Sequence, residues 1–137
     1  MKALTIRQPW AYAILHLGKD IENRSWRTHY RGPLLIHAGT HRSSSPSEML
    51  AEHMRRPPSD ESLRDLPRGY IVGVVYLEDC VRNSKSKWAD RGQWHWVLRK
   101  PRAIRQVKCK GRLGTWTPTA SVMRKLPKSL RAKIRRP

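Results

Sequence analysis

The sequence predicts an α+β fold in which about five or six strands form a small β-barrel and two or three short helices pack against it. Three features indicate this fold. Short apolar segments recur along 137 residues, which is the length of one ordinary domain. Apolar side chains at helical spacing are confined to short stretches. Gly73 interrupts the most apolar strand pattern, and a glycine there is typical of a strand that bends at a barrel corner.

The amino-terminal part of the chain predicts a strand, a helix and two further strands. Residues 2–6 (KALTI) form the first strand, and residues 10–17 carry apolar side chains at helical spacing until Gly18 ends the helix. Residues 21–26 change to the alternation of a strand. Residues 34–39 (LLIHAG) are a compact apolar strand.

The middle of the chain predicts a second helix, a loop and a central strand. The sequence SPSE at residues 45–48 has the capping-box form, so a helix is expected from there to about residue 55. Residues 56–69 are polar and contain prolines, which predicts a mobile loop. Residues 70–81 (YIVGVVYLEDCV) are nearly all apolar and rich in β-branched side chains, which is typical of a strand buried on both faces.

The last part of the chain completes the sheet and adds a basic extension. Strands are expected at residues 93–100 (QWHWVLRK) and 103–110 (AIRQVKCK). The domain is therefore predicted to span residues 1–117, and residues 118–137 to form a basic carboxy-terminal arm. Residues 124–137 contain seven Lys or Arg, which predicts that the arm is flexible or becomes a helix on a partner.

The positive charge of the chain is strong and unevenly distributed. The chain has 29 Lys and Arg against 10 Asp and Glu, a formal net charge of +19, and its last acidic residue is Asp90. Residues 91–137 contain 15 basic residues and no acid. Such a segment repels itself unless a polyanion neutralises it, so the expected partner is nucleic acid, either RNA or DNA. No stretch of the arm has an amphipathic apolar face, so no membrane partner is expected.

Composition also narrows the class of protein. No apolar run approaches the roughly 18 to 20 residues of a membrane span, and the chain leads directly into a strand-like segment, so a soluble cytoplasmic protein is expected. The chain has two cysteines, Cys80 and Cys109, which are too few for a disulfide framework or a zinc quartet. We therefore expect neither a metal nor a cofactor.

A charged trio follows the first predicted helix. Lys19 stands at the corner between helix and strand, while Glu22 and Arg24 lie two positions apart and share a strand face with Trp26. If this face points to water, the residues are an ordinary solvated strand. The opposite strand face is only weakly apolar, however, so the Trp26 face competes for the interior. A partly enclosed charged trio beside a tryptophan would line a cleft for a polar ligand. The residues alone leave both interpretations open.

The same segment resembles the ASCH family (activating signal cointegrator homology), a set of small β-barrel domains similar in fold to the PUA domains that bind RNA. The resemblance rests on QPW at residues 8–10, the G-K-x-x-E-x-R run at 18–24, SW at 25–26, RG at 31–32 and the strand LLIHA. The later segments VGVVYLEDC, QWHWVL and GRLGTW resemble the central, aromatic and closing segments of the family. The similarity therefore extends over about residues 2–117.

The resemblance implies a barrel whose central cleft is lined by Lys19, Glu22 and Arg24 and suits a nucleotide or a short stretch of nucleic acid. Members of the family include nucleic-acid binders, a ribonuclease and a bacterial branch that hydrolyses acetylated cytidine. In that branch a threonine usually occupies the position of Glu22, so acetylcytidine amidohydrolase activity is the least expected. In many members an extra residue separates the glycine from the lysine, so a tighter corner is expected at Lys19.

Further residues extend the predicted interface. Trp26, between Arg24 and Arg27, is the best candidate for stacking on a base. Arg31 belongs to the family motif, and His37 is either a hydrogen-bonded interior histidine or a general base. Basic residues also recur along the last two strands and their turn, and they would form a stripe for phosphates if they share a face. These residues are Arg99, Lys100, Arg102, Arg105, Lys108, Lys110 and Arg112.

These observations predict a protein that binds RNA or DNA through the charged cleft and an adjoining basic surface. The main alternative is a metal-independent ribonuclease acting on single-stranded RNA. In that case Lys19 and Glu22, with His37 and Arg24, would supply the general acid, the general base and the cation over the phosphate. A third hypothesis is a ribosome- or transcription-linked adaptor whose carboxy-terminal arm is the main contact.

Overall fold

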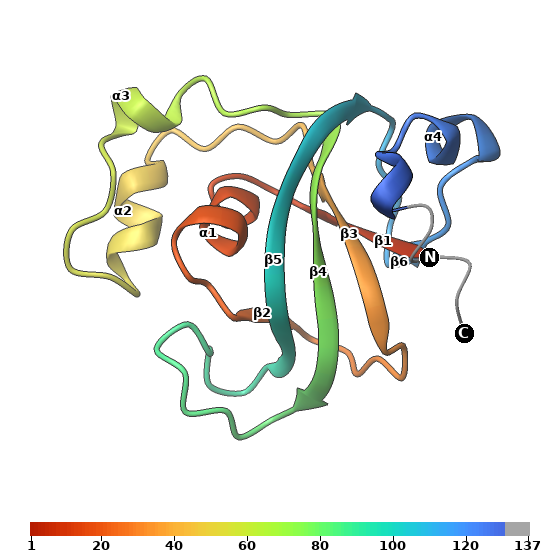
Figure 1. The fold of residues 1–137 in the computed structure, drawn as a ribbon. Helices are drawn as coiled ribbons and strands as arrows, with labels where there is room; N and C mark the ends of the chain where they lie inside the picture. Colours follow the sequence, from red (N-terminus) through yellow and green to blue (C-terminus); the bar gives the residue numbers. More distant parts are fainter. Residues whose placement is uncertain (131–137) are drawn as a thin grey trace.

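The computed structural model describes residues 1–130, which form one mixed sheet of six strands in the order β2-β5-β4-β3-β1-β6 (Figure 1). β1 pairs with β3 in parallel, and the other neighbouring pairs are antiparallel. The strands are β1 (Lys2–Ile6), β2 (Ile21–Arg24), β3 (Gly32–Ala38), β4 (Tyr70–Val81), β5 (Trp94–Lys108) and β6 (Thr115–Trp116). The helices are α1 (Trp10–His16), α2 (Pro46–Ala51), α3 (Asp60–Leu63) and α4 (Ala120–Arg124). The predicted α+β fold is confirmed.

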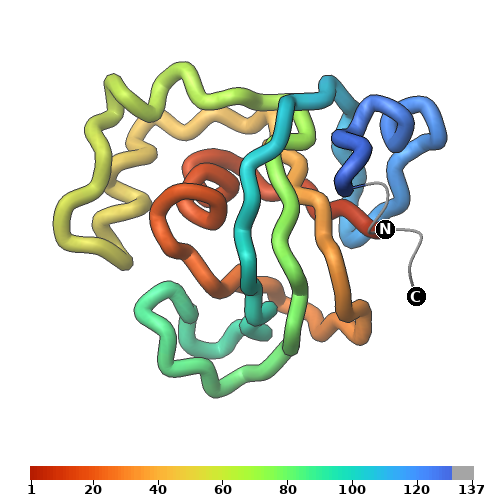
Figure 2. The backbone as a smooth tube through the Cα atoms, in the orientation of Figure 1, coloured from red at the N-terminus to blue at the C-terminus, as the bar shows by residue number. Residues whose placement is uncertain are grey.

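The sheet curls around α1, as the backbone traces show (Figures 1 and 2). In the strand order β2 and β1 are separated by three other strands. Arg24 on β2 nevertheless donates from Nη2 to the carbonyl oxygen of Thr5 on β1 over 3.0 Å. The curl therefore brings two distant strands within reach of one side chain, and the sheet forms a half-barrel.

Apolar side chains cover the inner face of the sheet and part of its outer face. On the inner face, which α1 covers, Ile14 of the helix belongs to one core with Leu77 and Trp96. On the outer face, Val74 and Val107 belong to a second core that includes residues from the end of the described chain. β4 lies between two antiparallel neighbours, and its residues 71–75 are buried on both faces, as predicted for this strand. From Tyr76 onward the outer face of the strand is exposed.

The described part of the predicted arm packs on the outer face of this sheet. α4 begins after Thr119, whose side chain accepts a hydrogen bond from the N–H of Val122. Leu126 and Leu130 are each 2 % exposed and lie in the outer-face core. Burial of these side chains holds the segment on the sheet. The rest of the predicted arm, residues 131–137, lies outside the described residues.

The second helix is shorter than the sequence predicted. α2 ends at Ala51 instead of about residue 55. The N–H groups of His53 and Met54 both donate to the carbonyl oxygen of Leu50 over 3.0 Å, so two donors share one carbonyl just after the helix. The expected capping box did not reveal this early end because it describes only the start of a helix.

Residues far apart in the sequence organise the segment around α2 and α3. The side chain of Ser45 makes no capping hydrogen bond, and the N–H of Ser47 donates instead to Oδ1 of Asp60 over 2.8 Å. The predicted mobile loop contains α3, whose Leu63 is buried at 1 % exposure. Among residues 1–130, no helix combines the length and the apolar character needed to cross a membrane.

The two strands expected at residues 93–100 and 103–110 are one continuous strand, β5. Pro101, which cannot donate a hydrogen bond to a neighbouring strand, lies between the two predicted segments. The strand instead carries a bulge at Lys100 and Pro101, where the register with β4 shifts and Lys100 has a φ of 54°. The bulge keeps the pairing on both sides and increases the local curl of the sheet.

Gly73 lies where β4 passes α1. A Cβ atom at this position would lie 2.5 Å from a methyl carbon of Leu15 and 2.8 Å from the carbonyl oxygen of Arg102. The register of β4 with β5 also shifts next to it. The irregularity expected at this glycine is therefore present, and the close approach of the helix is its physical reason.

Candidate functional site

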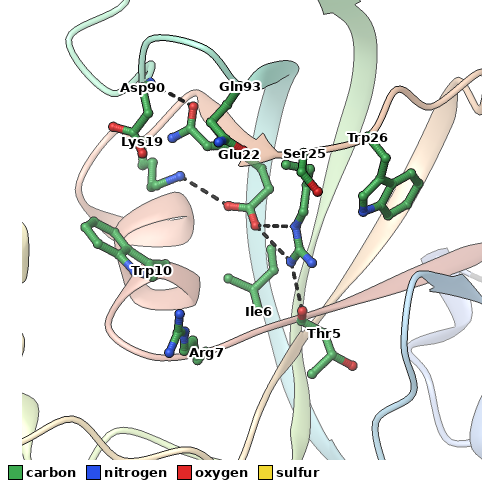
Figure 3. Close-up of a pocket in the computed structure, with 12 residues that line it drawn as sticks. Thr5, Ile6, Arg7, Trp10, Lys19, Glu22, Ser25, Trp26, Asp90 and Gln93 are labelled. Carbon is green, nitrogen blue, oxygen red and sulfur yellow. Dashed lines mark hydrogen bonds and ion pairs between the residues drawn. The ribbon is translucent and has the colours of Figure 1, made fainter.

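A cavity of about 470 Å³ opens on the inner face of the sheet beside the start of α1 (Figure 3). Its walls come from the end of β1, the start of α1, the corner after α1, strand β2 and the loop before β5. Polar and charged atoms form most of its surface. The lining residues are Thr5, Ile6, Arg7, Trp10, Lys19, Glu22, Asn23, Arg24, Ser25, Trp26, Asp90 and Gln93.

A buried charged cluster lies at the base of the cavity. Lys19 Nζ lies 3.3 Å from Oε1 of Glu22. Arg24 donates from Nε to Oε2 of Glu22 over 2.9 Å, and its Nη2 forms an ion pair with the same oxygen at 2.9 Å. Lys19 Nζ also donates to the carbonyl oxygen of Ile21. Lys19 is 4 % exposed and Glu22 is 7 % exposed. Two cations therefore share one carboxylate, and one positive charge of the cluster is not compensated within it.

Local sequence explains why these three side chains meet. Gly18 has a φ of 76°, which ends α1, and the N–H of Lys19 then donates to the carbonyl oxygen of Ala13 over 3.1 Å. The chain enters β2 directly after this corner. Because side chains alternate along a strand, Glu22 and Arg24 point to the same side. The sequence prediction of a shared face is confirmed, and the face points to the interior.

Two tryptophans stand on opposite sides of Glu22 (Figure 3). The ammonium group of Lys19 lies 5.6 Å from the ring centroid of Trp10. Trp26 is 38 % exposed, and its ring packs edge-on against Trp96 with centroids 4.7 Å apart. The indole N–H of Trp96 donates to the Trp26 carbonyl over 3.3 Å, which fixes the backbone of this wall. A flat group that enters the cavity would meet aromatic surface at its sides and charge at its base.

The loop before β5 closes a third side of the cavity. Asn23 donates from Nδ2 to the Trp88 carbonyl over 2.9 Å and accepts from the N–H of Asp90 over 2.8 Å, so it holds this loop on β2. The Asp90 carboxylate lies 3.4 Å from Nε2 of His53, whose ring stacks on Trp88. Arg7 is exposed and adds a second source of positive charge at the mouth.

The arrangement suits binding of a planar, polar and negatively charged group better than proton transfer. Both oxygens of Glu22 already accept hydrogen bonds from cations, so this carboxylate is not a free base. The ammonium of Lys19 is held by Glu22 and a carbonyl oxygen. Arg24 is the most accessible of the three, with a side chain that is 24 % exposed. Its guanidinium is the group of the cluster that a ligand would meet first.

His37 lies outside this cavity, in a closed polar cluster next to β1. Its Nε2 donates to the Cys109 carbonyl over 2.6 Å, and its Nδ1 accepts from the Thr5 hydroxyl over 3.2 Å. The Thr5 hydroxyl oxygen in turn accepts from the indole N–H of Trp116 over 3.2 Å. Burial lowers the pKa of His37, and the hydrogen bond to the Cys109 carbonyl opposes that shift. His37 is therefore a neutral interior histidine with both ring nitrogens engaged.

Arg31 also lies away from the cavity. Its Nη1 donates to the carbonyl oxygens of Thr28 over 3.0 Å and Tyr30 over 2.9 Å. Its Nη2 lies 3.6 Å from the carboxylate of Asp79. Arg31 therefore stabilises the turn that precedes β3 and does not line the cavity.

Arg99 and Arg102 of the basic stripe point away from the face of the sheet that borders the cavity. These residues lie opposite Tyr76 and Val74 of β4, and Val74 belongs to the outer-face core. Residues that lie opposite each other in neighbouring strands share a face. Both arginines therefore lie across the sheet from the cavity, and Arg99 forms an ion pair with Glu78 at 3.2 Å. The bulge in β5 was not predicted, and it changes which side chains share a face.

The remaining residues of the stripe continue along β5 and the loop that follows it. These residues are exposed and none of them lines the cavity: Lys100, Arg105, Lys108, Lys110 and Arg112. Gly111 of this loop packs against the side chains of Thr5 on β1 and His37 on β3. Phosphate binding by these basic residues stays a prediction.

Neither cysteine is a reactive group of the site. Cys80 is buried in the inner-face core. Burial raises the pKa of the Cys109 thiol, an effect that nearby Arg112 opposes, so the thiolate needed for nucleophilic or metal chemistry is disfavoured. Within residues 1–130, no group of three or more His, Cys, Asp or Glu side chains is placed to hold a metal ion.

Several residues at or near the cavity were missed by sequence reasoning. Trp10 packs against the core and also lines the cavity, and the QPW motif that contains it was a usable signal. Asp90 and Gln93 lie in a loop whose position no local pattern revealed. Trp94 packs against the core but is only partly buried, and the guanidinium groups of two arginines lie over its ring.

Comparison with known proteins places this geometry in a family. Residues 4–108 match the ASCH domain family, and this range includes every residue that lines the cavity. The chain belongs to the ASCH domain family. The charged cluster, the two tryptophan walls and the loop over Asp90 are therefore all parts of an ASCH domain.

Two relatives of this ASCH domain carry the same name. The sequence is 38 % identical to activating signal cointegrator 1 of Homo sapiens over 88 residues, which covers 61 % of this chain and 15 % of that protein. It is 39 % identical to activating signal cointegrator 1 of Mus musculus over 82 residues, which covers 57 % of this chain and 14 % of that protein. The chain therefore matches only a small part of the length of these relatives.

Proposed function

We propose that this ASCH domain binds nucleic acid, RNA or DNA, by taking one unpaired nucleotide into the cavity between Trp10 and Trp26. The observation that carries the proposal is the buried cluster of Lys19, Glu22 and Arg24 at the base of a cavity with aromatic sides. Its volume of about 470 Å³ falls in the range of small-ligand sites. The net charge of +19 attracts a polyanion to the whole molecule.

Each residue has a definite role in this proposal. Trp26 stacks on the base, because its ring is partly exposed at the mouth of the cavity. Arg24 contacts a phosphate or a base edge, and Glu22 holds the Arg24 guanidinium in place. Lys19 compensates the charge of Glu22 and supports the Trp10 wall.

Observed contacts favour binding over cleavage. A ribonuclease that uses a 2′-hydroxyl nucleophile needs a general base that can accept its proton. In the cavity, Glu22 is already engaged by two cations, and His37 lies in a separate cluster with both ring nitrogens hydrogen-bonded. No contact among the described residues specifically supports cleavage, and the experiment below tests it directly.

The test incubates the purified protein, with and without a chelator, with labelled single-stranded RNA, single-stranded DNA and duplex DNA. Native gels measure binding, and denaturing gels measure cleavage. We expect intact single strands that shift with the protein and that shift less with Trp26→Ala. Tyr76→Ala is the matched control, because Tyr76 is an exposed aromatic residue, at 46 %, on the outer face of the sheet.

Three outcomes would contradict the proposal. Equal loss of binding in Trp26→Ala and Tyr76→Ala would show that the cavity is not the binding site. Stronger binding of duplex than of single strands would exclude an unpaired nucleotide as the preferred ligand. RNA fragments that disappear with Lys19→Ala would make this ASCH domain a ribonuclease.

A further inference from the structure

A pair of arginines stacked on a tryptophan lies directly beside the cavity. The guanidinium carbon of Arg27 lies 5.5 Å from the ring centroid of Trp94, and that of Arg82 lies 5.1 Å from the same centroid. Arg82 also donates to the Gly92 carbonyl over 3.3 Å. Contact with the ring limits the motion of both guanidinium groups and leaves their N–H edges available for hydrogen bonds.

The side chains of this pair adjoin the charged cluster along the sheet. Trp94 lies opposite Arg24 in the pairing of β5 with β2, so the two side chains share a face and are neighbours. Trp26, which lines the cavity, immediately precedes Arg27 in the chain. A path over the protein surface therefore runs from Arg24 to the Arg27–Trp94–Arg82 stack.

Arg27 and Arg82 differ from the arginines on the outer face in whether other side chains pair with them. Neither Arg27 nor Arg82 forms an ion pair with any acid among residues 1–130. Arg99 on the outer face is paired with Glu78, and Arg102 donates to the Ser129 hydroxyl over 3.0 Å. Two uncompensated and pre-positioned cations beside the cavity are better placed for phosphates than paired cations across the sheet.

We propose that a single strand whose nucleotide occupies the cavity leaves it over Trp26 and crosses the Arg27–Trp94–Arg82 stack, where the two arginines bind the next phosphates. This inference rests on the proposed function of the cavity and adds a direction to it. The stack acts as an exit path for the strand, and the outer-face arginines of β5 do not contact it.

The experiment measures fluorescence anisotropy with a labelled oligothymidylate of about ten nucleotides, a length within the site sizes of single-strand binders. Thymidine monophosphate, which reaches only the cavity, is measured by competition. The test variant is Arg27→Gln/Arg82→Gln, and the matched control is Arg99→Gln/Arg102→Gln. Arg27→Lys/Arg82→Lys keeps the charge but loses the planar stacking group. Thermal melting of every variant checks that the fold is retained.

The expected result is specific to the long strand. The glutamine variant of the stack should bind the oligonucleotide on the order of tenfold more weakly, and the slope of log K against log salt should fall by about 1.4 for two lost phosphate contacts. Its affinity for thymidine monophosphate should not change. The outer-face control should keep wild-type affinity for both, and the lysine variant should lie between wild type and the glutamine variant.

Other results separate failure of the exit path from failure of the cavity. Equal weakening by the outer-face control would overturn the path and assign the phosphates to β5. A glutamine variant that loses thymidine monophosphate as strongly as the oligonucleotide would place both arginines in the cavity site and also overturn the path. A wild-type protein that binds the oligonucleotide while thymidine monophosphate does not compete would contradict the proposed function of the cavity itself.

Discussion

Two buried polar clusters meet at Thr5, and they differ in whether they border space that a ligand could enter. The Thr5 carbonyl accepts from Arg24 of the charged cluster, whereas the Thr5 hydroxyl belongs to the cluster around His37. The charged cluster borders a cavity of about 470 Å³ and contains one uncompensated positive charge. The His37 cluster is closed by Gly111, which leaves no space for an added Cβ atom.

The comparison teaches that burial of polar groups does not by itself mark a functional site. Both ring nitrogens of His37 have partners inside the protein, so this cluster has nothing to offer a ligand. The Lys19, Glu22 and Arg24 cluster is also hydrogen-bonded, but it faces space that a ligand can occupy. We expect substitutions in the His37 cluster to change stability alone, and substitutions in the Lys19, Glu22 and Arg24 cluster to change ligand binding as well.

The largest effect on stability is expected at the centre of the charged cluster. Glu22→Gln would leave two neighbouring cations, of which Lys19 is almost fully buried, without a counter-charge. Loss of one partner from a buried ion pair costs about 3 kcal/mol, so the midpoint of urea unfolding should fall clearly. Lys19→Met is the control, because Glu22 keeps Arg24 as a partner and the loss should be much smaller. Equal losses in both variants would contradict the shared-carboxylate arrangement.

A smaller loss of stability is expected when an atom is added to the closely packed His37 cluster. In Gly111→Ala the new Cβ would lie 2.6 Å from Thr5 Oγ1 and 2.8 Å from His37 Cε1, and such overpacking costs about 2 kcal/mol. Gly18→Ala provides the comparison, because nothing lies within 4 Å of its Cβ and only the φ of 76° opposes the substitution. That change should cost about 1 kcal/mol. Urea unfolding that ranks the two variants in the opposite order would refute a tightly closed cluster.

A substitution at the mouth of the cavity should weaken nucleic-acid binding more than it lowers the free energy of unfolding. Trp26→Ala removes a stacking surface, and stacking of one base contributes about 1 to 3 kcal/mol, so single-strand affinity should fall roughly tenfold or more. Since Trp26 is 38 % exposed, the loss of unfolding free energy should be about 1 kcal/mol, from its contact with Trp96. Anisotropy and urea unfolding on the same samples separate the two effects.

The smallest expected effect is a pH dependence of stability from the His37 cluster. Because burial lowers the pKa of His37, the unfolded chain binds this proton more readily than the folded protein. Stability should therefore decrease as the pH falls below the ordinary histidine pKa of 6.5. Thermal melting between about pH 7.5 and pH 5 should show a shallower decrease for His37→Asn than for the exposed-site control His16→Gln. Identical slopes would mean that His37 does not contribute.

The amino-acid sequence by itself determined the parts of this protein that depend on local spacing. Alternation along residues 21–24 placed Glu22 and Arg24 on one face, and Gly18 placed the corner that presents Lys19 to them. The alternation could not say whether this face pointed to water or to the interior. The family motif resolved the fold, since the match at residues 4–108 confirms the resemblance.

Tertiary structure alone decided which distant side chains share a space. The curl of the sheet brings Arg24 to Thr5, and the bulge at Lys100 and Pro101 accompanies the placement of Arg99 and Arg102 on the outer face. Strand curl and bulges arise from the packing of the whole sheet, and a shift of one residue moves a side chain to the opposite face. Local spacing therefore determined which groups are neighbours along a strand, and only three-dimensional packing decided which of them border a cavity.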